Sequence, residues 1–262
     1  MKISIITATY NSAVTIAQCI ASVNGQTYPN IEHIIVDGAS NDNTTEIIKS
    51  MPNRVTQLIS EPDNGIYDAM NKGISIATGD IIGTLNSDDF YTANDVIERI
   101  VSAFQLETVE GVYGDVCFVR PANLKKVVRY YSAALFKPAM LRFGFMPPHP
   151  GFYVRSKKYK ELGLYKTDYR IAADYELLIR FLKVNKIKTQ YLNFCVVTMR
   201  TGGDSTRNIK SNWILNREIV RGCRENGIYT NMIILSLKYM VKITGLLFPK
   251  RMKNQKKPYF IL

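Results

Sequence analysis

Apolar runs alternate with helix-like stretches through the first third of the chain. Residues 2–8 are rich in β-branched residues, which is typical of a buried strand. The next stretch has apolar residues near helical spacing, and Ser12 could cap its start. The same alternation then predicts the following elements: helices at 12–24, 43–50 and 66–77, and strands at 32–36, 55–60 and 80–85. This order predicts an α/β fold with a doubly wound, mainly parallel sheet.

Polar residues cluster where these expected strands end. The four clusters are Thr9-Tyr10-Asn11, Asp37-Gly38, Glu61-Pro62-Asp63 and Asn86-Ser87-Asp88-Asp89. Ligands of doubly wound sheets bind beyond the carboxyl ends of the strands, so a ligand site is expected along this edge. The adjacent carboxylates of Asp88 and Asp89 suit a hard divalent cation, and an Asp-rich turn is the alternative.

The pattern is less regular in the second half. Strands are expected at 113–119 and 126–131, a long loop at 135–151, and helices at 156–162, 174–184 and 212–226. Residues 232–248 are apolar except for Lys238 and Lys242, which lie four apart and therefore on one helical face. A basic cluster follows. The chain thus divides at about residues 110 and 230, and ends in a basic amphipathic tail at 231–262.

The composition excludes several classes of protein. With 46% hydrophobic and 21% charged residues, the chain is globular rather than disordered, collagen-like or coiled-coil. Its four cysteines form no CxxC pair and only two histidines accompany them, so we interpret the cysteines as core residues rather than zinc ligands or disulfides. The sequence shows neither a signal peptide nor an apolar run of roughly 18–20 residues, so a cytoplasmic or peripheral protein is expected.

Charge is divided unequally along the chain. Residues 1–120 carry 6 Lys and Arg against 15 Asp and Glu, whereas residues 121–262 carry 28 against 7. The acidic half suits a cation, and the basic half suits an anionic partner such as nucleic acid or an anionic membrane. The chain has none of the aromatic-and-basic motifs of the common RNA-binding modules, which disfavours a nucleic-acid-binding protein.

Four segments, in this order, resemble the signature of family 2 glycosyltransferases. They are Ser4–Asn11, Ile35–Ser40, Asn64–Gly73 and Asn86–Asp89. The resemblance is dense over residues 1–90 and looser to about residue 205. It implies a GT-A fold and an inverting, nucleotide-sugar-dependent enzyme, with residues 1–110 binding the donor and residues 111–230 supplying the acceptor site and the catalytic base. The alternative enzyme, a nucleotidyltransferase, would have a Gly-rich basic loop after the first strand.

The resemblance implies roles for individual residues at the donor site. The implied nucleotide-sugar-binding residues are Thr7, Thr9, Tyr10, Asp37, Asp63, Asn64, Lys72, Asn86, Ser87 and Asp88. Asp37 would recognise the base or else form an Asx turn before Gly38. Lys72 would approach the diphosphate or the base, or else be a solvated helix lysine. Asp88 matches the aspartate that binds Mg²⁺ or Mn²⁺, whereas Asn86 stands where the motif often has its first aspartate.

A segment around residue 174 resembles the part of the family that carries the catalytic base. Asp174 would take the proton of the acceptor hydroxyl, or else cap a helix, and Glu176 is the backup base. His149 would complete the metal site or touch the diphosphate, with an incidental loop histidine as the alternative. A later Gly-containing loop, of the kind that closes over a donor, supplies two further contacts: Arg200 and Ser205.

The resemblance also implies the reaction and its biological context. The sugar would pass from a UDP-sugar to a glycan or lipid-linked glycan, in the synthesis of a bacterial capsule, O-antigen or other surface polysaccharide. Residues 232–257 fit an interfacial helix on an anionic membrane. Packing of this tail on the domain, or a homodimer contact, is the alternative. We therefore expect a cytoplasmic protein that is peripheral at the inner face of the cytoplasmic membrane, with no nucleic-acid partner.

Overall fold

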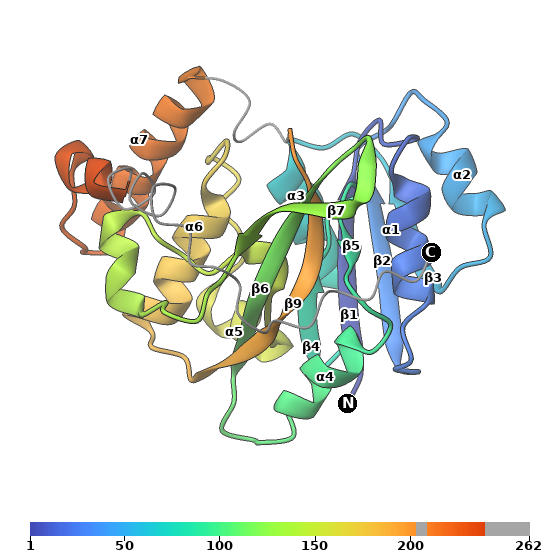
Figure 1. The fold of residues 1–262 in the computed structure, drawn as a ribbon, viewed down its shortest axis with the longest axis horizontal. Helices are drawn as coiled ribbons and strands as arrows, with labels where there is room; N and C mark the ends of the chain where they lie inside the picture. Colours follow the sequence, from blue (N-terminus) through green and yellow to red (C-terminus); the bar gives the residue numbers. More distant parts are fainter. Residues whose placement is uncertain (203–208, 239–262) are drawn as a thin grey trace.

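The computed structural model of the chain describes residues 1–202 and 209–238 (Figure 1). Its first elements are β1 (Ile3–Thr9), α1 (Ile16–Asn24), β2 (Ile31–Asp37), α2 (Thr44–Ser50), β3 (Val55–Ser60), α3 (Ile66–Ile76) and β4 (Ile81–Thr84). Every element predicted between residues 2 and 85 is therefore present. One detail is wrong, because Ser12 does not cap α1: the N-cap position is Thr15, and the backbone oxygen of Ser12 instead accepts from the N–H groups of Thr15 and Ile16.

The second half contains elements that the pattern predicts and others that it missed. Those predicted are β6 (Gly111–Arg120), β7 (Asn123–Tyr131), α5 (Ser156–Leu162), α6 (Ala173–Leu178) with its π-helical continuation η3 (Ile179–Val184), and α7 (Ile209–Glu225). Those missed are β5 (Phe90–Tyr91), α4 (Val96–Ala103), β8 (Phe152–Arg155) and β9 (Thr189–Arg200). The expected loop at 135–151 contains two short 3-10 turns, η1 (Pro138–Phe143) and η2 (His149–Gly151).

The described strands form one nine-stranded sheet in the order β3-β2-β1-β4-β8-β6-β9-β5, with β7 paired to β6. Strands β1 to β4 are parallel to one another, and β6 is parallel to β9. The antiparallel members are β8, β5 and β7. The mainly parallel α/β fold is thus confirmed, and the ends of β1 to β4 share the edge that the polar clusters follow.

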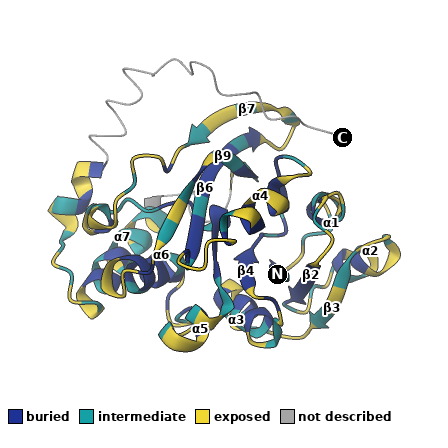
Figure 2. Ribbon diagram, turned by 90° about the horizontal axis from the view of Figure 1, so that it is seen from below, coloured by how far each residue is buried: buried dark blue, intermediate teal, exposed yellow. Residues whose placement is uncertain are grey.

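Helices cover both faces of the sheet, which confirms the doubly wound arrangement (Figures 1 and 2). Residues of α1, α2 and α4 form a core on one face, and residues of α3, α5, α6 and α7 form a core on the other. Alternation along β1 divides its side chains between them, so that Ile5 enters the first core and Ile6 the second. A Cβ atom added at Gly73 would lie 2.4 Å from Cγ2 of Ile6, so this glycine lets α3 lie directly on the sheet.

The cysteines are core residues as expected. Cys19, Cys117 and Cys223 are buried, Cys195 is partly buried, and all four are free thiols. Within residues 1–202 and 209–238, no helix has the length and apolar character needed to cross a membrane.

Candidate active site

The ends of β1 and β2 form one side of the site. Tyr10 is 60% exposed and available to stack on a ligand, whereas Thr9 is buried and its Oγ1 has no hydrogen-bond partner among the residues that the structure describes. Thr7 requires a correction. It is fully buried, and its hydroxyl bonds to Nε2 of His33 at 3.0 Å, so it supports the strand from within the core and does not line a pocket. Burial lowers the pKa of His33 to about 4, which keeps the imidazole neutral.

Asp37 is buried at the end of β2 and is held by two serines. Its Oδ2 accepts from the backbone N–H of Ser40 at 3.0 Å and from Oγ of Ser60 at 2.7 Å, and its Oδ1 accepts from Oγ of Ser40. The carboxylate therefore fastens the turn after β2 to the end of β3. Since a carboxylate has about four acceptor positions, one remains for a ligand N–H. Base recognition by Asp37 stays a prediction.

The loop after β3 folds over the end of β2. A Cβ atom at Gly38 would lie 2.5 Å from Oδ2 of Asp63, so only glycine lets this carboxylate approach so closely. Oδ1 of Asp63 accepts from the N–H of Gly65 at 2.8 Å, and the N–H of Asn64 donates to Asp68 at 3.0 Å. These bonds shape the loop so that it leads directly into α3.

Lys72 braces this loop from α3. Its Nζ lies 2.8 Å from Oε1 of Glu61 and 3.8 Å from Oδ2 of Asp68, and it donates to the carbonyl of Pro62 at 3.0 Å. The hydrogen bond to Glu61 raises the pKa of Lys72, so the amine stays charged. Lys72 is therefore neither a freely solvated lysine nor, in this conformation, a group that points at a diphosphate; its contact with the donor stays a prediction.

The turn after β4 carries two carboxyl groups in different surroundings, those of Asp88 and Asp89. Ser87 bonds to the hydroxyl of Ser12 at 2.8 Å, and Nδ2 of Asn86 donates to Asp89 at 3.2 Å. Burial, and then the neighbouring charge of Asp88, raise the pKa of Asp89 well above its usual range. Among the described residues, none donates a hydrogen bond to the carboxylate of Asp88, and Oδ1 of Asn86 is buried without a partner.

Arg200 holds this turn from the end of β9. Its guanidinium donates to the backbone oxygen of Asp88 and to Oε1 of Gln18, and it lies 5.4 Å from the ring centroid of Phe90. Arg200 therefore contacts the backbone of the aspartate turn, and its expected contact with the donor stays a prediction. Ser205, the other predicted contact in this loop, lies outside the described residues.

Two cavities open along this edge of the sheet. The larger, about 450 Å³, lies beside Asp88 between the start of α1, the turn from β6 to β7, and Arg200. The smaller, about 290 Å³, lies between residues 64–67 at the start of α3 and residues 167–170 before α6. The larger one is within the usual size range of small-molecule sites.

Asp174 lies in the first turn of α6 and is 13% exposed. Its Oδ2 is 3.3 Å from Nδ1 of His149, and its Oδ1 accepts from the N–H of Tyr175 at 2.8 Å and lies 3.4 Å from the hydroxyl of Tyr67. The two predicted residues Asp174 and His149 therefore meet each other. Within residues 1–202 and 209–238, no group of three or more His, Cys, Asp or Glu side chains could hold a metal. A role for His149 in a metal site with Asp88 stays a prediction.

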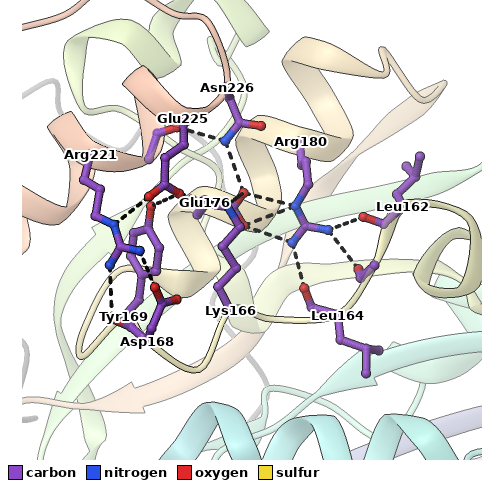
Figure 3. A network of polar contacts seen from close by, with 12 residues as sticks. Leu162, Leu164, Lys166, Asp168, Tyr169, Glu176, Arg180, Arg221, Glu225 and Asn226 are labelled. Atoms are coloured by element: carbon purple, nitrogen blue, oxygen red, sulfur yellow. Dashed lines mark hydrogen bonds and ion pairs between the residues drawn. The ribbon is translucent and has the colours of Figure 1, made fainter.

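The backup base is wrong. Glu176 is fully buried and forms ion pairs with Arg180 at 2.9 Å and Lys166 at 3.3 Å (Figure 3). Since both oxygens are engaged by these cations and by Asn226, Glu176 is a structural residue of α6. The contact between the hydroxyl of Tyr67 and Asp174 was not predicted, although Tyr67 belongs to a segment that resembles the family.

The fold and this edge together define a GT-A glycosyltransferase, and comparison with known proteins agrees. A family model described as "Glycosyl transferase family 2" matches residues 4–178. A PGL/p-HBAD biosynthesis glycosyltransferase of Mycobacterium bovis is 30% identical over 218 residues, which cover 82% of each chain. The chain therefore belongs to glycosyltransferase family 2 and is an enzyme of that class.

Solved structures share the fold at low sequence identity. Residues 1–349 of S. aureus TarS in complex with UDP-GlcNAc superpose with a TM-score of 0.68 at 16% identity, covering 87% of this chain and 68% of that one. This chain spans 43% of a longer TarS structure. The mannosyltransferase PcManGT from Pyrobaculum calidifontis, in complex with GDP-Man and Mn²⁺, gives a TM-score of 0.60 at 17% identity, covering 95% and 81%.

Proposed function

We propose that this enzyme transfers a sugar, with inversion, from a UDP-sugar to a hydroxyl of a glycan or lipid-linked glycan in surface polysaccharide synthesis. The observation that carries the proposal is the link between the base and the donor edge. Tyr67 lies 3.4 Å from the carboxylate of Asp174, and its helix begins immediately after Gly65, in the loop that packs on the end of β2. A similar fold that binds UDP-GlcNAc supports the choice of donor.

The reaction needs one proton acceptor and one site for the leaving group. The acceptor oxygen forms a bond to the anomeric carbon while the bond from that carbon to the diphosphate oxygen breaks, and the diphosphate leaves as UDP. Asp174 takes the proton of the attacking hydroxyl, and such general base catalysis contributes on the order of 10²–10⁴-fold. Nδ1 of His149, 3.3 Å away, orients the carboxylate when it carries a proton.

The residues present at the β4 turn fit a divalent cation. Asp88 offers a carboxylate that receives no hydrogen bond from the described residues, and Oδ1 of Asn86 is a buried oxygen without a partner. Oxygen ligands of this kind suit Mg²⁺ or Mn²⁺, which commonly bind through one or two carboxylates together with substrate phosphates. A bound cation would offset the charge of the leaving diphosphate. A neighbour of the same fold binds Mn²⁺ with GDP-Man.

Calorimetry with UDP, GDP and dTDP, each with and without Mn²⁺, tests the donor class. We expect Mn²⁺-dependent binding of UDP, weakened by Asp88→Ala. We expect Asp174→Asn to bind UDP normally and to lose at least about 10²-fold in kcat. Binding of GDP or dTDP but not UDP would show that the donor carries that nucleotide instead of UDP. Full turnover by Asp174→Asn would show that Asp174 is not the base.

We further propose that the end of the described chain contacts an anionic membrane surface, which places the enzyme at the inner face of the cytoplasmic membrane. Residues 232–238 are helical and turn Met232, Ile233 and Leu237 toward solvent, with Ile233 78% exposed. Lys238, which was expected to share one helical face with Lys242, is 4% exposed and donates to Oδ1 of Asn216 at 2.7 Å. Apolar side chains therefore supply this contact.

Vesicle co-sedimentation tests the membrane proposal with the full chain. Ile233→Asp should reduce binding to vesicles that contain phosphatidylglycerol, whereas Val14→Asp, at an exposed apolar position in the other half of the chain, should not. Equal binding by both variants would contradict the proposal. A dimer through the same face would instead show as a mass change that Ile233→Asp abolishes in the absence of lipid.

A further inference from the structure

One carboxylate of α7 holds the loop that precedes the base. Glu218 accepts three successive backbone N–H groups, from Arg170 at 2.8 Å, Ile171 at 2.9 Å and Ala172 at 2.9 Å. The first donates to Oε1 and the other two donate to Oε2. Hydrogen bonds to an ionised carboxylate are roughly twice as strong as those between neutral groups, so three of them fix this stretch of backbone firmly.

This stretch of backbone carries the contacts of the base. Ala172 is the N-cap position of α6, and Asp174 follows it by two residues. The carbonyl of Ile171 accepts from the hydroxyl of Tyr67, the same hydroxyl that lies 3.4 Å from Asp174. A shift of residues 170–172 would therefore move both the base and its aromatic neighbour.

A separate network ties α7 to the same region mainly through side chains, and Arg221 also donates to the backbone carbonyl of Asp168 at 3.2 Å (Figure 3). Glu225 pairs with Lys166 and Arg221 and accepts from the hydroxyl of Tyr169, and Arg221 also pairs with Asp168. Burial opposes ionisation of Glu225, but these hydrogen bonds outweigh it and lower its pKa to about 2. The network therefore anchors α7, whereas among these contacts it is Glu218 that binds the backbone next to the base.

We propose that Glu218 is a positioning residue of the transfer reaction, which acts by fixing the backbone before Asp174 so that its carboxylate meets the acceptor hydroxyl. This inference rests on the proposed function, in which Asp174 is the base. Glu218 lies 40 residues beyond the segment 4–178 that matches the family, so nothing in that match assigns it a role. A misplacement of about 1 Å at a reacting group can cost about 10²-fold in rate, so the effect should be large.

Glu218→Gln is the informative variant, because its amide keeps one acceptor oxygen and replaces the other with a donor that faces N–H groups. The matched control is Glu225→Gln, on the same helix, which removes only side-chain partners. The assay is UDP release from UDP-GlcNAc and other UDP-hexoses with water as the acceptor, together with calorimetric binding of UDP and the Tm of each variant. We expect Glu218→Gln to lower kcat by about 10- to 10²-fold while UDP affinity changes less than about twofold.

A double-mutant cycle separates positioning from a merely structural role. If Glu218 acts through the base, Glu218→Gln added to Asp174→Asn should lower kcat little further, since residues that act as a unit are not additive. The inference would be overturned if the effects of Glu218→Gln and Asp174→Asn on kcat multiply in the double variant. It would also be overturned if Glu218→Gln leaves kcat unchanged, or if Glu225→Gln lowers kcat as much as Glu218→Gln does. If Asp174→Asn leaves kcat unchanged, or the wild-type enzyme releases no UDP from any UDP-hexose, the proposed function is wrong, and the inference that depends on it is wrong as well. A normal response to Asp174→Asn with no response to Glu218→Gln refutes only the positioning role.

Discussion

Glu32 should stabilise the fold without serving the active site, which makes it a test of how the sheet is held together. It lies at the amino end of β2, and its side chain is 3% exposed. Its carboxylate accepts from Nζ of Lys2 at 2.6 Å, from the N–H of Thr78 at 2.8 Å, and from the hydroxyls of Ser4 and Thr78. These bonds join β1, β2 and the residues before β4 at the edge opposite the donor residues.

The magnitude follows from the pKa of this buried carboxyl. Burial alone would raise the pKa of Glu32, but the hydrogen bonds from Lys2, Ser4 and Thr78 outweigh burial and lower this pKa from 4.5 to about 2. At about 1.4 kcal/mol for each tenfold change, this corresponds to roughly 3 kcal/mol of stability. Because the folded-state pKa is depressed, the contribution is complete above about pH 5 and is lost as the pH falls from 4.5 toward 2, with about 2 kcal/mol gone by pH 3.

Urea unfolding of Glu32→Gln at pH 7 and pH 3 measures this contribution. At pH 7 the variant should be less stable by about 3 kcal/mol, a midpoint shift of about 1 M for a slope near 3 kcal/mol/M. At pH 3 the difference should shrink to about 1 kcal/mol, because Glu32 is then protonated in the unfolded chain but still largely ionised in the folded wild type, so that folding must release a proton. Glu46→Gln, at an exposed position on α2, is the control for the loss of one glutamate charge. A variant as stable as the wild type at pH 7, or a gap that does not narrow at pH 3, would refute the reasoning, and UDP affinity should be unchanged throughout.

Three further substitutions probe the site and its support. His149→Gln should lower kcat about tenfold with unchanged UDP affinity, because it removes the ring that orients the base carboxylate; steady-state kinetics that show no loss would make the histidine incidental. Gly73→Ala should destabilise the fold by about 1–3 kcal/mol, since the new Cβ would lie 2.4 Å from Cγ2 of Ile6, and an unchanged Tm would mean that α3 moves aside at no cost. Arg200→Met should weaken UDP binding in Mn²⁺ about tenfold by releasing the backbone oxygen of Asp88, whereas equal affinity would limit Arg200 to support of the fold.

The donor half of the fold could be predicted from the sequence because its signals are local. Each strand from β1 to β4 is a short apolar run, and each is followed by polar residues at the edge where ligands bind. Asp37, Asp63 and Asp88 therefore come together at one edge without any long-range inference. The missed helix α4 was also predictable, since Val96, Ile97, Ile100 and Val101 form a clear helical stripe.

The second half depends on contacts that the sequence pattern does not display. Strand β9 was missed because its register against β6 shifts between Gly114 and Val116, and such a bulge breaks the alternation that marks a strand. Strand β8 has four residues, of which three are buried, so it shows no alternation at all. Short, irregular strands of this kind take their place from their neighbours in the sheet rather than from their own pattern.

The same division applies to the functional residues, and it explains why the roles of the predicted residues changed. Asp174 was identified from its own segment, but its partner His149 lies 25 residues earlier, so only the folded chain could pair them. Arg200 was expected to touch phosphate, yet it reaches 112 residues back to the carbonyl of Asp88. In the proposed function, donor recognition is thus built from residues beside their own strand ends, whereas the backbone before the proposed base Asp174 is held by distant residues, including Glu218. Substitutions in the first group should therefore change donor affinity, and substitutions in the second should change kcat.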